Sequence, residues 1–137
     1  MKVQHVAVEF VHQVWPLVEP LIRQGVERRD RPGDYSLEEM RTLVAMGHWM
    51  TIVASEDDGK IVGVALVNFI NRPSARVAFI TFVSGRGLAN NKMYGMLANV
   101  LKMFGATTME AAVVGSRERL WRRVGLVEKY RIVETKL

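Results

Sequence analysis

Residues 84–91 of the chain (SGRGLANN) have the composition of an anion-binding loop that joins an apolar run to a helical pattern. Gly85 and Gly87 permit a close backbone approach to a ligand, and Arg86 adds positive charge. One of two asparagines caps the helix that follows, and the unpaired N–H groups and positive dipole of a helix N-terminus favour a phosphate group. We therefore expect this loop to bind a phosphate-bearing ligand.

Glu110 is the acid best placed for general-base chemistry. It stands among apolar residues on a strand expected at 107–114. A half-buried carboxylate can have a raised pKa and act as a general base. The alternative is that Glu110 faces solvent or pairs with an arginine such as Arg117, in which case its role is structural.

A group of arginines lies on the expected last helix: Arg117, Arg119, Arg122 and Arg123. Spacings of three and four residues bring the last three close together on the helix surface. This arrangement favours recognition of an anion, either a cofactor phosphate or a nucleic acid. The alternative is a solvated helix face, and we expect Trp121 on the same helix to anchor the core.

The clearest signal for the elements that position these residues is a hairpin at 49–70. Two apolar runs rich in β-branched residues flank the turn Asp57-Asp58-Gly59-Lys60, in which the glycine supplies the positive φ of a tight turn. A capping box from Ser36 to Glu39 predicts the start of a helix shortly before this hairpin.

The full order of expected elements is β-α-α-β-β-β-α-β-α-β, with the last strand at 126–135. A strand at 75–83, the glycine loop, a helix to Gly105 and the strand at 107–114 form a right-handed crossover. The order predicts an α+β fold of three layers, in which helices cover both faces of a mixed, mostly antiparallel central sheet. The 137 residues suit a single domain spanning 1–137.

Composition excludes several kinds of site. The chain has no cysteine, which rules out disulfides, thiolate metal sites and a cysteine nucleophile, and its three histidines show no metal-binding spacing. We therefore expect no metal cofactor. No apolar run approaches the roughly 18–20 residues of a membrane helix, so a cytoplasmic location and no membrane partner are expected.

With this order of elements, the chain resembles the GNAT superfamily of N-acetyltransferases over essentially its whole length. Ile61-Val62-Gly63 resembles the family's motif at the start of the second hairpin strand, and residues 120–126 (LWRRVGL) resemble its C-terminal motif. Four further features are similar to those of short GNAT-like proteins encoded by bacteriophages and prophages: Trp15 with Pro20, the helix capped by Ser36, Gly47 with Trp49, and Arg117 with Trp121 and Gly125.

The resemblance implies an acyltransferase that moves an acetyl group from acetyl-CoA to an unidentified amine by direct attack, since no cysteine is available for a covalent intermediate. Glu110 would be the base, and Tyr130 the acid if the last strand brings it near. Trp121 occupies the position of the family's acidic tyrosine, and its indole cannot donate that proton. The resemblance leaves a homodimer open, because members of the family often dimerise, and the sequence does not reveal the oligomeric state. The implied acetyl-CoA site consists of Val83, Ser84, Gly85, Arg86, Gly87, Leu88, Ala89, Asn90 and Asn91.

Three hypotheses stay open, and the acetyltransferase is favoured. The second is a GNAT-fold protein without catalysis, of phage or prophage origin, that acts through a protein partner. It is motivated by Trp121 and by Asn91, which falls where the family usually has a small residue. The third and least favoured is a nucleic-acid-binding module, motivated by the net charge of +5 and the arginines of the last helix.

Overall fold

A single five-stranded sheet forms the centre of the computed structural model, which describes residues 1–29, 33–88, 91–113 and 117–137. The strands lie in the order β1-β2-β3-β4-β5. Neighbours from β1 to β4 are antiparallel, and β5 is parallel to β4, which confirms the mixed, mostly antiparallel sheet expected from the sequence. The strands span Lys2–Val6, Met50–Ser55, Ile61–Arg72, Ala75–Gly85 and Thr108–Ala111.

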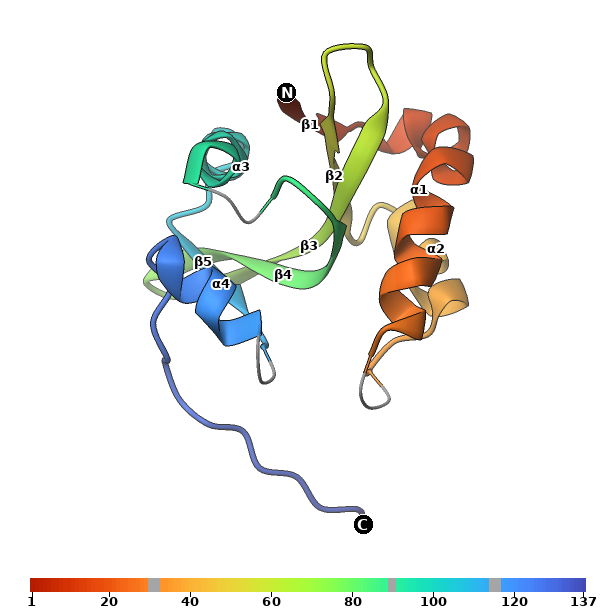
Figure 1. Ribbon diagram of the computed structural model, residues 1–137. Helices are drawn as coiled ribbons and strands as arrows, with labels where there is room; N and C mark the ends of the chain where they lie inside the picture. Colours follow the sequence, from red (N-terminus) through yellow and green to blue (C-terminus); the bar gives the residue numbers. More distant parts are fainter. Residues whose placement is uncertain (30–32, 89–90, 114–116) are drawn as a thin grey trace.

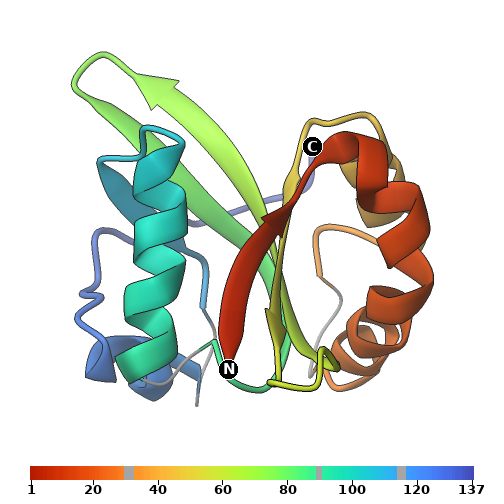
Figure 2. The same ribbon diagram turned by 90° about the horizontal axis from the view of Figure 1, so that it is seen from above.

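Helices cover both faces of this sheet, which confirms the expected three layers (Figures 1 and 2). α1 and α2 lie on one face and α3 on the other. A buried cluster fills each interface, with Trp15 and Val18 of α1 in one and Leu97 of α3 with Trp121 of α4 in the other. The helical segments are η1 at Val8–Phe10, α1 at Val11–Glu27, α2 at Leu37–Ala45, α3 at Asn91–Met103 and α4 at Arg117–Arg123.

The hairpin formed by β2 and β3 agrees with the sequence prediction. Gly59 adopts a φ of 88°, and the Lys60 N–H donates to the Asp58 carboxylate at 2.9 Å. The predicted capping box is also confirmed, because the Glu39 N–H donates to the Ser36 hydroxyl at 3.1 Å and the Ser36 N–H donates to the Glu39 carboxylate at 3.0 Å. Local side-chain chemistry therefore sets both element boundaries.

A β-bulge interrupts β4 at Thr81. Leu66 of β3 pairs with Phe82 and the next residue, Val67, pairs with Ile80, so Thr81 is the extra residue. The Thr81 hydroxyl donates to the Leu66 carbonyl at 2.8 Å. The parallel pairing between β4 and β5 ends at Ile80, directly before the bulge, while β4 continues to Gly85. Because a bulge bends its strand and increases the twist, it accounts for the divergence of β4 from β5.

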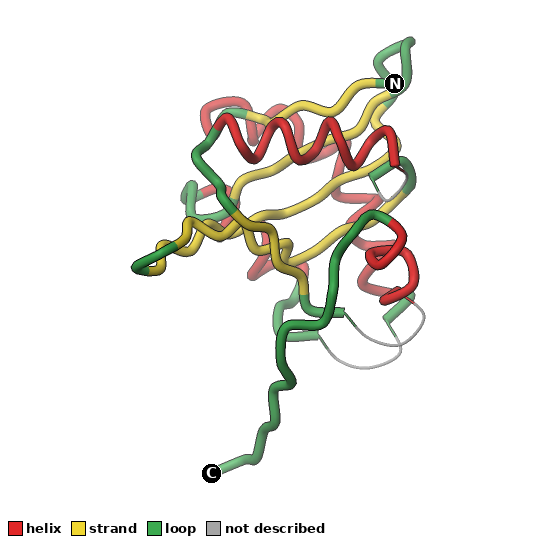
Figure 3. The backbone as a smooth tube through the Cα atoms, turned by 90° about the vertical axis from the view of Figure 1, so that its left-hand side faces the viewer, coloured by secondary structure: helices red, strands yellow, loops and turns green. Residues whose placement is uncertain are grey.

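The strand expected at 126–135 is wrong. Residues 126–137 follow α4 but take no part in the sheet, and residues 131–137 run away from the other elements (Figures 1 and 3). The β-branched residues of this segment favour an extended backbone, but a strand also needs a neighbour to accept its hydrogen bonds and to cover its side chains. The sequence pattern did not identify a pairing partner.

Candidate functional site

The glycine loop after β4 lies tightly against β3. The Arg86 N–H donates to the Val62 carbonyl at 2.9 Å, and Gly85 adopts a φ of 81°. A Cβ at Gly85 would clash with the Val62 carbonyl oxygen, and one at Gly63 would clash with the Arg86 carbonyl oxygen. Glycine is therefore required on both sides of this contact, which fixes the loop at the end of β4.

A cavity of about 750 Å³ opens beside this loop. Its walls contain seven of the nine residues expected to hold acetyl-CoA, namely Val83, Ser84, Gly85, Arg86, Gly87, Leu88 and Asn91. The other two, Ala89 and Asn90, lie outside the described residues. The remaining lining comes from α1 and its end, with Gly25 and Arg28, and from α4, with Leu120, Trp121 and Arg123.

The charge of this cavity is positive. Arg28, Arg86 and Arg123 line it, and no aspartate or glutamate does so among the described residues. Arg86 forms an ion pair with Glu56 at 2.6 Å on the exposed surface. Within the described part of the chain, Arg28 and Arg123 have no ion pair and remain available to a ligand.

Part of the cavity wall is a stretch of β4 that is not paired with β5. Beyond Ile80 the outer edge of β4 has no β5 partner, and Val83, Ser84 and Gly85 of this stretch line the cavity. Unpaired backbone N–H and C=O groups on a strand edge can pair with an extended ligand that carries amides. The helix α3 begins at Asn91 on the same cavity wall and directs the positive end of its dipole there.

Close packing between α1 and β4 forms another part of the cavity wall. The Ser84 hydroxyl donates to the Leu21 carbonyl at 2.5 Å. A Cβ at Gly25 would lie 2.7 Å from both the Phe82 ring and the Ser84 hydroxyl oxygen, so only glycine allows α1 to approach this closely. The sequence analysis did not assign Gly25 to the site, because a contact between elements so far apart in the chain leaves no local signal.

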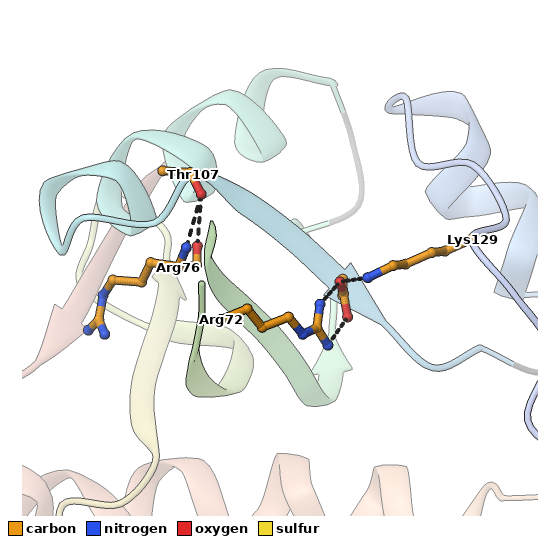
Figure 4. Close-up of polar contacts among 5 residues, drawn as sticks. Arg72, Arg76, Thr107 and Lys129 are labelled. Carbon is orange, nitrogen blue, oxygen red and sulfur yellow. Dashed lines mark hydrogen bonds and ion pairs between the residues drawn. The ribbon is translucent and has the colours of Figure 1, made fainter. Parts of the chain in front are cut away.

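Glu110 lies in an ion-pair cluster and does not line the cavity beside the glycine loop. Its carboxylate accepts two hydrogen bonds from the Arg72 guanidinium, at 2.5 and 3.2 Å, and one from the Lys129 ammonium at 2.7 Å (Figure 4). The hydrogen bonds from Arg72 and then Lys129 lower the pKa of Glu110 from 4.5 to about 2. The raised pKa expected from the sequence is wrong, because these cations outweigh the effect of burial.

Tyr130 shares a second cavity with Glu110 and does not line the first. This groove of about 1020 Å³ lies between β5 and the start of the C-terminal segment. The Tyr130 side chain is 59% exposed, since the strand expected to carry it is not formed. Trp121 is buried, as expected for a core anchor, and lines both cavities.

The arginines of α4 do not act as one group. Arg122 forms an ion pair with Glu118 at 2.7 Å, and Arg123 lines the positive cavity. Arg119 is exposed, and the Arg117 side chain lies outside the described residues. In the described part of the chain, no cluster of three metal-ligating side chains occurs. No helix there is long and apolar enough to cross a membrane.

Comparison with known proteins gives a match at the level of structure. No protein-family model and no curated protein sequence matches the chain. The ribosomal-protein-alanine N-acetyltransferase of Brucella melitensis biovar Abortus 2308 superimposes with a TM-score of 0.71 over 100% of both chains, at 15% identity. An aminoglycoside acetyltransferase from an uncultured soil metagenomic sample, in complex with sisomicin, gives 0.70 over 99% of this chain and 94% of that one, at 13% identity.

A further match is the aminoglycoside antibiotic 6'-N-acetyltransferase of Acinetobacter baumannii. Its TM-score is 0.63 at 17% identity, over 99% of this chain and 97% of that one. At such identities the likeness establishes the fold alone. The fold is that of the GNAT acetyltransferases, as expected from the order of the elements.

Proposed function

We propose that this GNAT-fold chain is an N-acetyltransferase that transfers an acetyl group from acetyl-CoA to an amine. The observation that carries the proposal is the positive cavity at the end of β4, in which a glycine loop, an unpaired strand edge and the start of α3 meet. Acetyl-CoA combines an anionic pyrophosphate, an extended arm with amides, and a thioester. The first two of these parts have chemically matched walls in this cavity.

The pyrophosphate would lie against the loop of Gly85, Arg86 and Gly87, where backbone N–H groups and the dipole of α3 favour negative charge. Arg28 and Arg123 also line the cavity and would supply further cations. The amide-bearing arm would pair with the free edge of β4 beyond Ile80. The thioester would then be directed into the gap between β4 and β5.

The reaction is a direct displacement, because the chain has no cysteine to carry the acetyl group. The amine nitrogen forms a bond to the acetyl carbon, and the carbon–sulfur bond breaks. The amine loses one proton to a base, and the departing thiolate gains one. Glu110 and Tyr130 are the residues predicted for these two transfers. The low pKa of Glu110 makes it a weak base, and solvent at the open cavity can take the proton in its place.

The competing function is binding without catalysis, acting through a protein partner. A specific observation favours it: Trp121 is buried in the core at the position that resembles the family's acidic tyrosine. Such a protein would bind coenzyme A or a partner and release no thiol. Measurement of transfer therefore separates the two functions once binding has been established.

Thermal unfolding with and without acetyl-CoA tests the proposal. Binding at a hundredfold excess over Kd should stabilise the protein by about 2.7 kcal/mol. Arg123→Ala should reduce the shift, and Arg119→Ala is the matched control because it removes an exposed arginine of the same helix that does not line the cavity. Absence of any shift at millimolar acetyl-CoA would refute the proposal.

Release of free thiol from acetyl-CoA, measured with a panel of amines, then tests the transfer step. Tyr130→Phe tests the predicted acid, since it removes only the hydroxyl. A protein that binds acetyl-CoA but releases no thiol with any amine would support the non-catalytic function.

A further inference from the structure

Two of the arginines that line the cavity beside the glycine loop come from opposite faces of the sheet. Arg123 lies on α4, whose Trp121 packs in the same buried cluster as α3. Arg28 directly follows α1, which packs in the cluster on the other face. The helix α1 reaches the cavity because Gly25 allows it to lie against Ser84 of β4. The cavity therefore has a cation on each side of the end of β4.

The side chain of Arg28 is available to a ligand. Within the described residues it forms no ion pair, whereas the neighbouring Arg29 donates to the Tyr35 carbonyl at 3.2 Å and Arg23 pairs with Glu19 at 2.9 Å. The proposed pyrophosphate site is at the start of α3, on the face of the sheet opposite α1. Arg28 is therefore the cation of the cavity farthest in the fold from the helix assigned to the cofactor.

A cationic ligand finds no free carboxylate in this cavity. Among the described residues, no aspartate or glutamate lines it. Glu56 is paired with Arg86 at 2.6 Å, and Glu27, next to Arg28 in the chain, lines a separate hollow on α1. A ligand with several positive charges would be repelled by the arginines, and a ligand with a negative group would be attracted.

We propose that the acceptor amine belongs to a molecule that also carries a carboxylate or a phosphate group, and that Arg28 binds this anionic group. The inference rests on the proposed acetyl transfer and specifies the class of amine. A guanidinium group forms paired hydrogen bonds to carboxylate and to phosphate, so both anions fit the chemistry of the site. With the cofactor on the side of α3, the amine would approach the thioester from the side of α1, where Arg28 holds the anion.

Matched pairs of small amines test this preference. Thiol release is measured at saturating acetyl-CoA with γ-aminobutyrate against butylamine, ε-aminocaproate against hexylamine, and phosphoethanolamine against ethanolamine. The anionic member of a pair should have a kcat/KM about fivefold higher, a modest factor because solvent screens an exposed arginine. The carboxylate and phosphate pairs show which anion is preferred. Equal values within all three pairs, or a higher value for the polyamine spermidine than for every anionic amine, would overturn the inference.

Substitution of Arg28 tests whether this residue is the source of the preference. Arg28→Gln should bring the ratio of the two kcat/KM values close to one, through a higher KM for the anionic amine, and Arg28→Lys should keep part of the ratio because the charge remains. Arg119→Gln is the matched control, since it removes an exposed arginine that does not line the cavity, and it should leave the ratio unchanged. The wild-type ratio should also shrink as the salt concentration rises. A ratio that survives Arg28→Gln overturns the inference.

Binding measured without turnover separates this inference from the proposed reaction. Protein saturated with coenzyme A is titrated in a calorimeter with ε-aminocaproate and with hexylamine. Tighter binding of ε-aminocaproate that Arg28→Gln abolishes supports the anion site, and the absence of thiol release with every amine would then refute the reaction alone. Acetyl transfer without any difference between the two amines, in rate or in binding, would overturn the anion preference and leave the reaction in place.

Discussion

Replacement of Glu110 by glutamine should destabilise the fold in a way that depends on pH. The pKa of this carboxyl is about 2 in the folded chain and 4.5 as the reference value, a difference worth about 3 kcal/mol at neutral pH. The Arg72 and Lys129 side chains are 35% and 54% exposed, so solvent screens part of this energy. We expect a loss of about 2 kcal/mol for Glu110→Gln at pH 7.

The sign of the pH dependence follows from the lowered pKa. The stabilisation is fully present above pH 4.5 and is lost as the pH falls from 4.5 toward 2, because the unfolded chain takes up the proton first. Urea unfolding of wild type and Glu110→Gln at pH 7, 5 and 3 should therefore show a difference that shrinks with acidity. Glu134→Gln is the control, since Glu134 is exposed and forms no ion pair within the described residues.

Two results would contradict this reasoning. One is a Glu110→Gln variant as stable as wild type at pH 7, which would mean that the ion pairs with Arg72 and Lys129 contribute nothing. The other is a loss of stability that is equal at pH 7 and pH 3, which would point to altered packing instead of altered charge. Arg72→Lys keeps the charge but loses the two parallel hydrogen bonds, so it should recover only part of the stabilisation.

Further predictions concern the loop, the helix cap and the ligand. Gly85→Ala should cost more than about 3 kcal/mol in urea unfolding, because its Cβ clashes with Val62, whereas Gly59→Ala, with a similar φ and open space, should cost only about 1 kcal/mol. Ser36→Ala should cost about 1 kcal/mol through loss of the cap. The affinity for acetyl-CoA, measured by calorimetry, should fall as the salt concentration rises, since arginines line the cavity. An affinity that does not change with salt would contradict a contribution of these arginines to binding.

Much of the fold could be predicted from local patterns. The hairpin turn at Gly59 and the helix cap at Ser36 each depend on residues within a few positions of one another. A short stretch of sequence is therefore enough to predict both features. The glycine loop around Arg86 could be recognised for the same reason, and the structure gathers its described residues around one cavity, while anion binding there stays a prediction. Interactions between residues close together in the chain are the part of the site that a single sequence predicts.

What could not be predicted depends on register. Arg72 and Glu110 are 38 positions apart, and they meet only because β3 ends beside β4 while β5 lies parallel to β4 on its other side. The burial of Glu110 could be inferred from its apolar neighbours. The approach of Arg72 and Lys129 could not, because neither residue is next to Glu110 in the sequence. Arg28 joins the cavity in the same way, through the position of α1 against β4.

The extra residue at Thr81 also changes the phase of β4. Side chains alternate between the faces of a strand, yet Ile80 packs on the α3 side while Phe82 packs on the α1 side. Because Thr81 is the extra residue, its deletion would place Phe82 directly after Ile80 and would leave Phe82 and Ser84 on the α1 side and Val83 on the α3 side. The inserted residue thus contributes the bend and twist of β4, and a single-codon deletion at this position would straighten the strand while every remaining side chain kept its face.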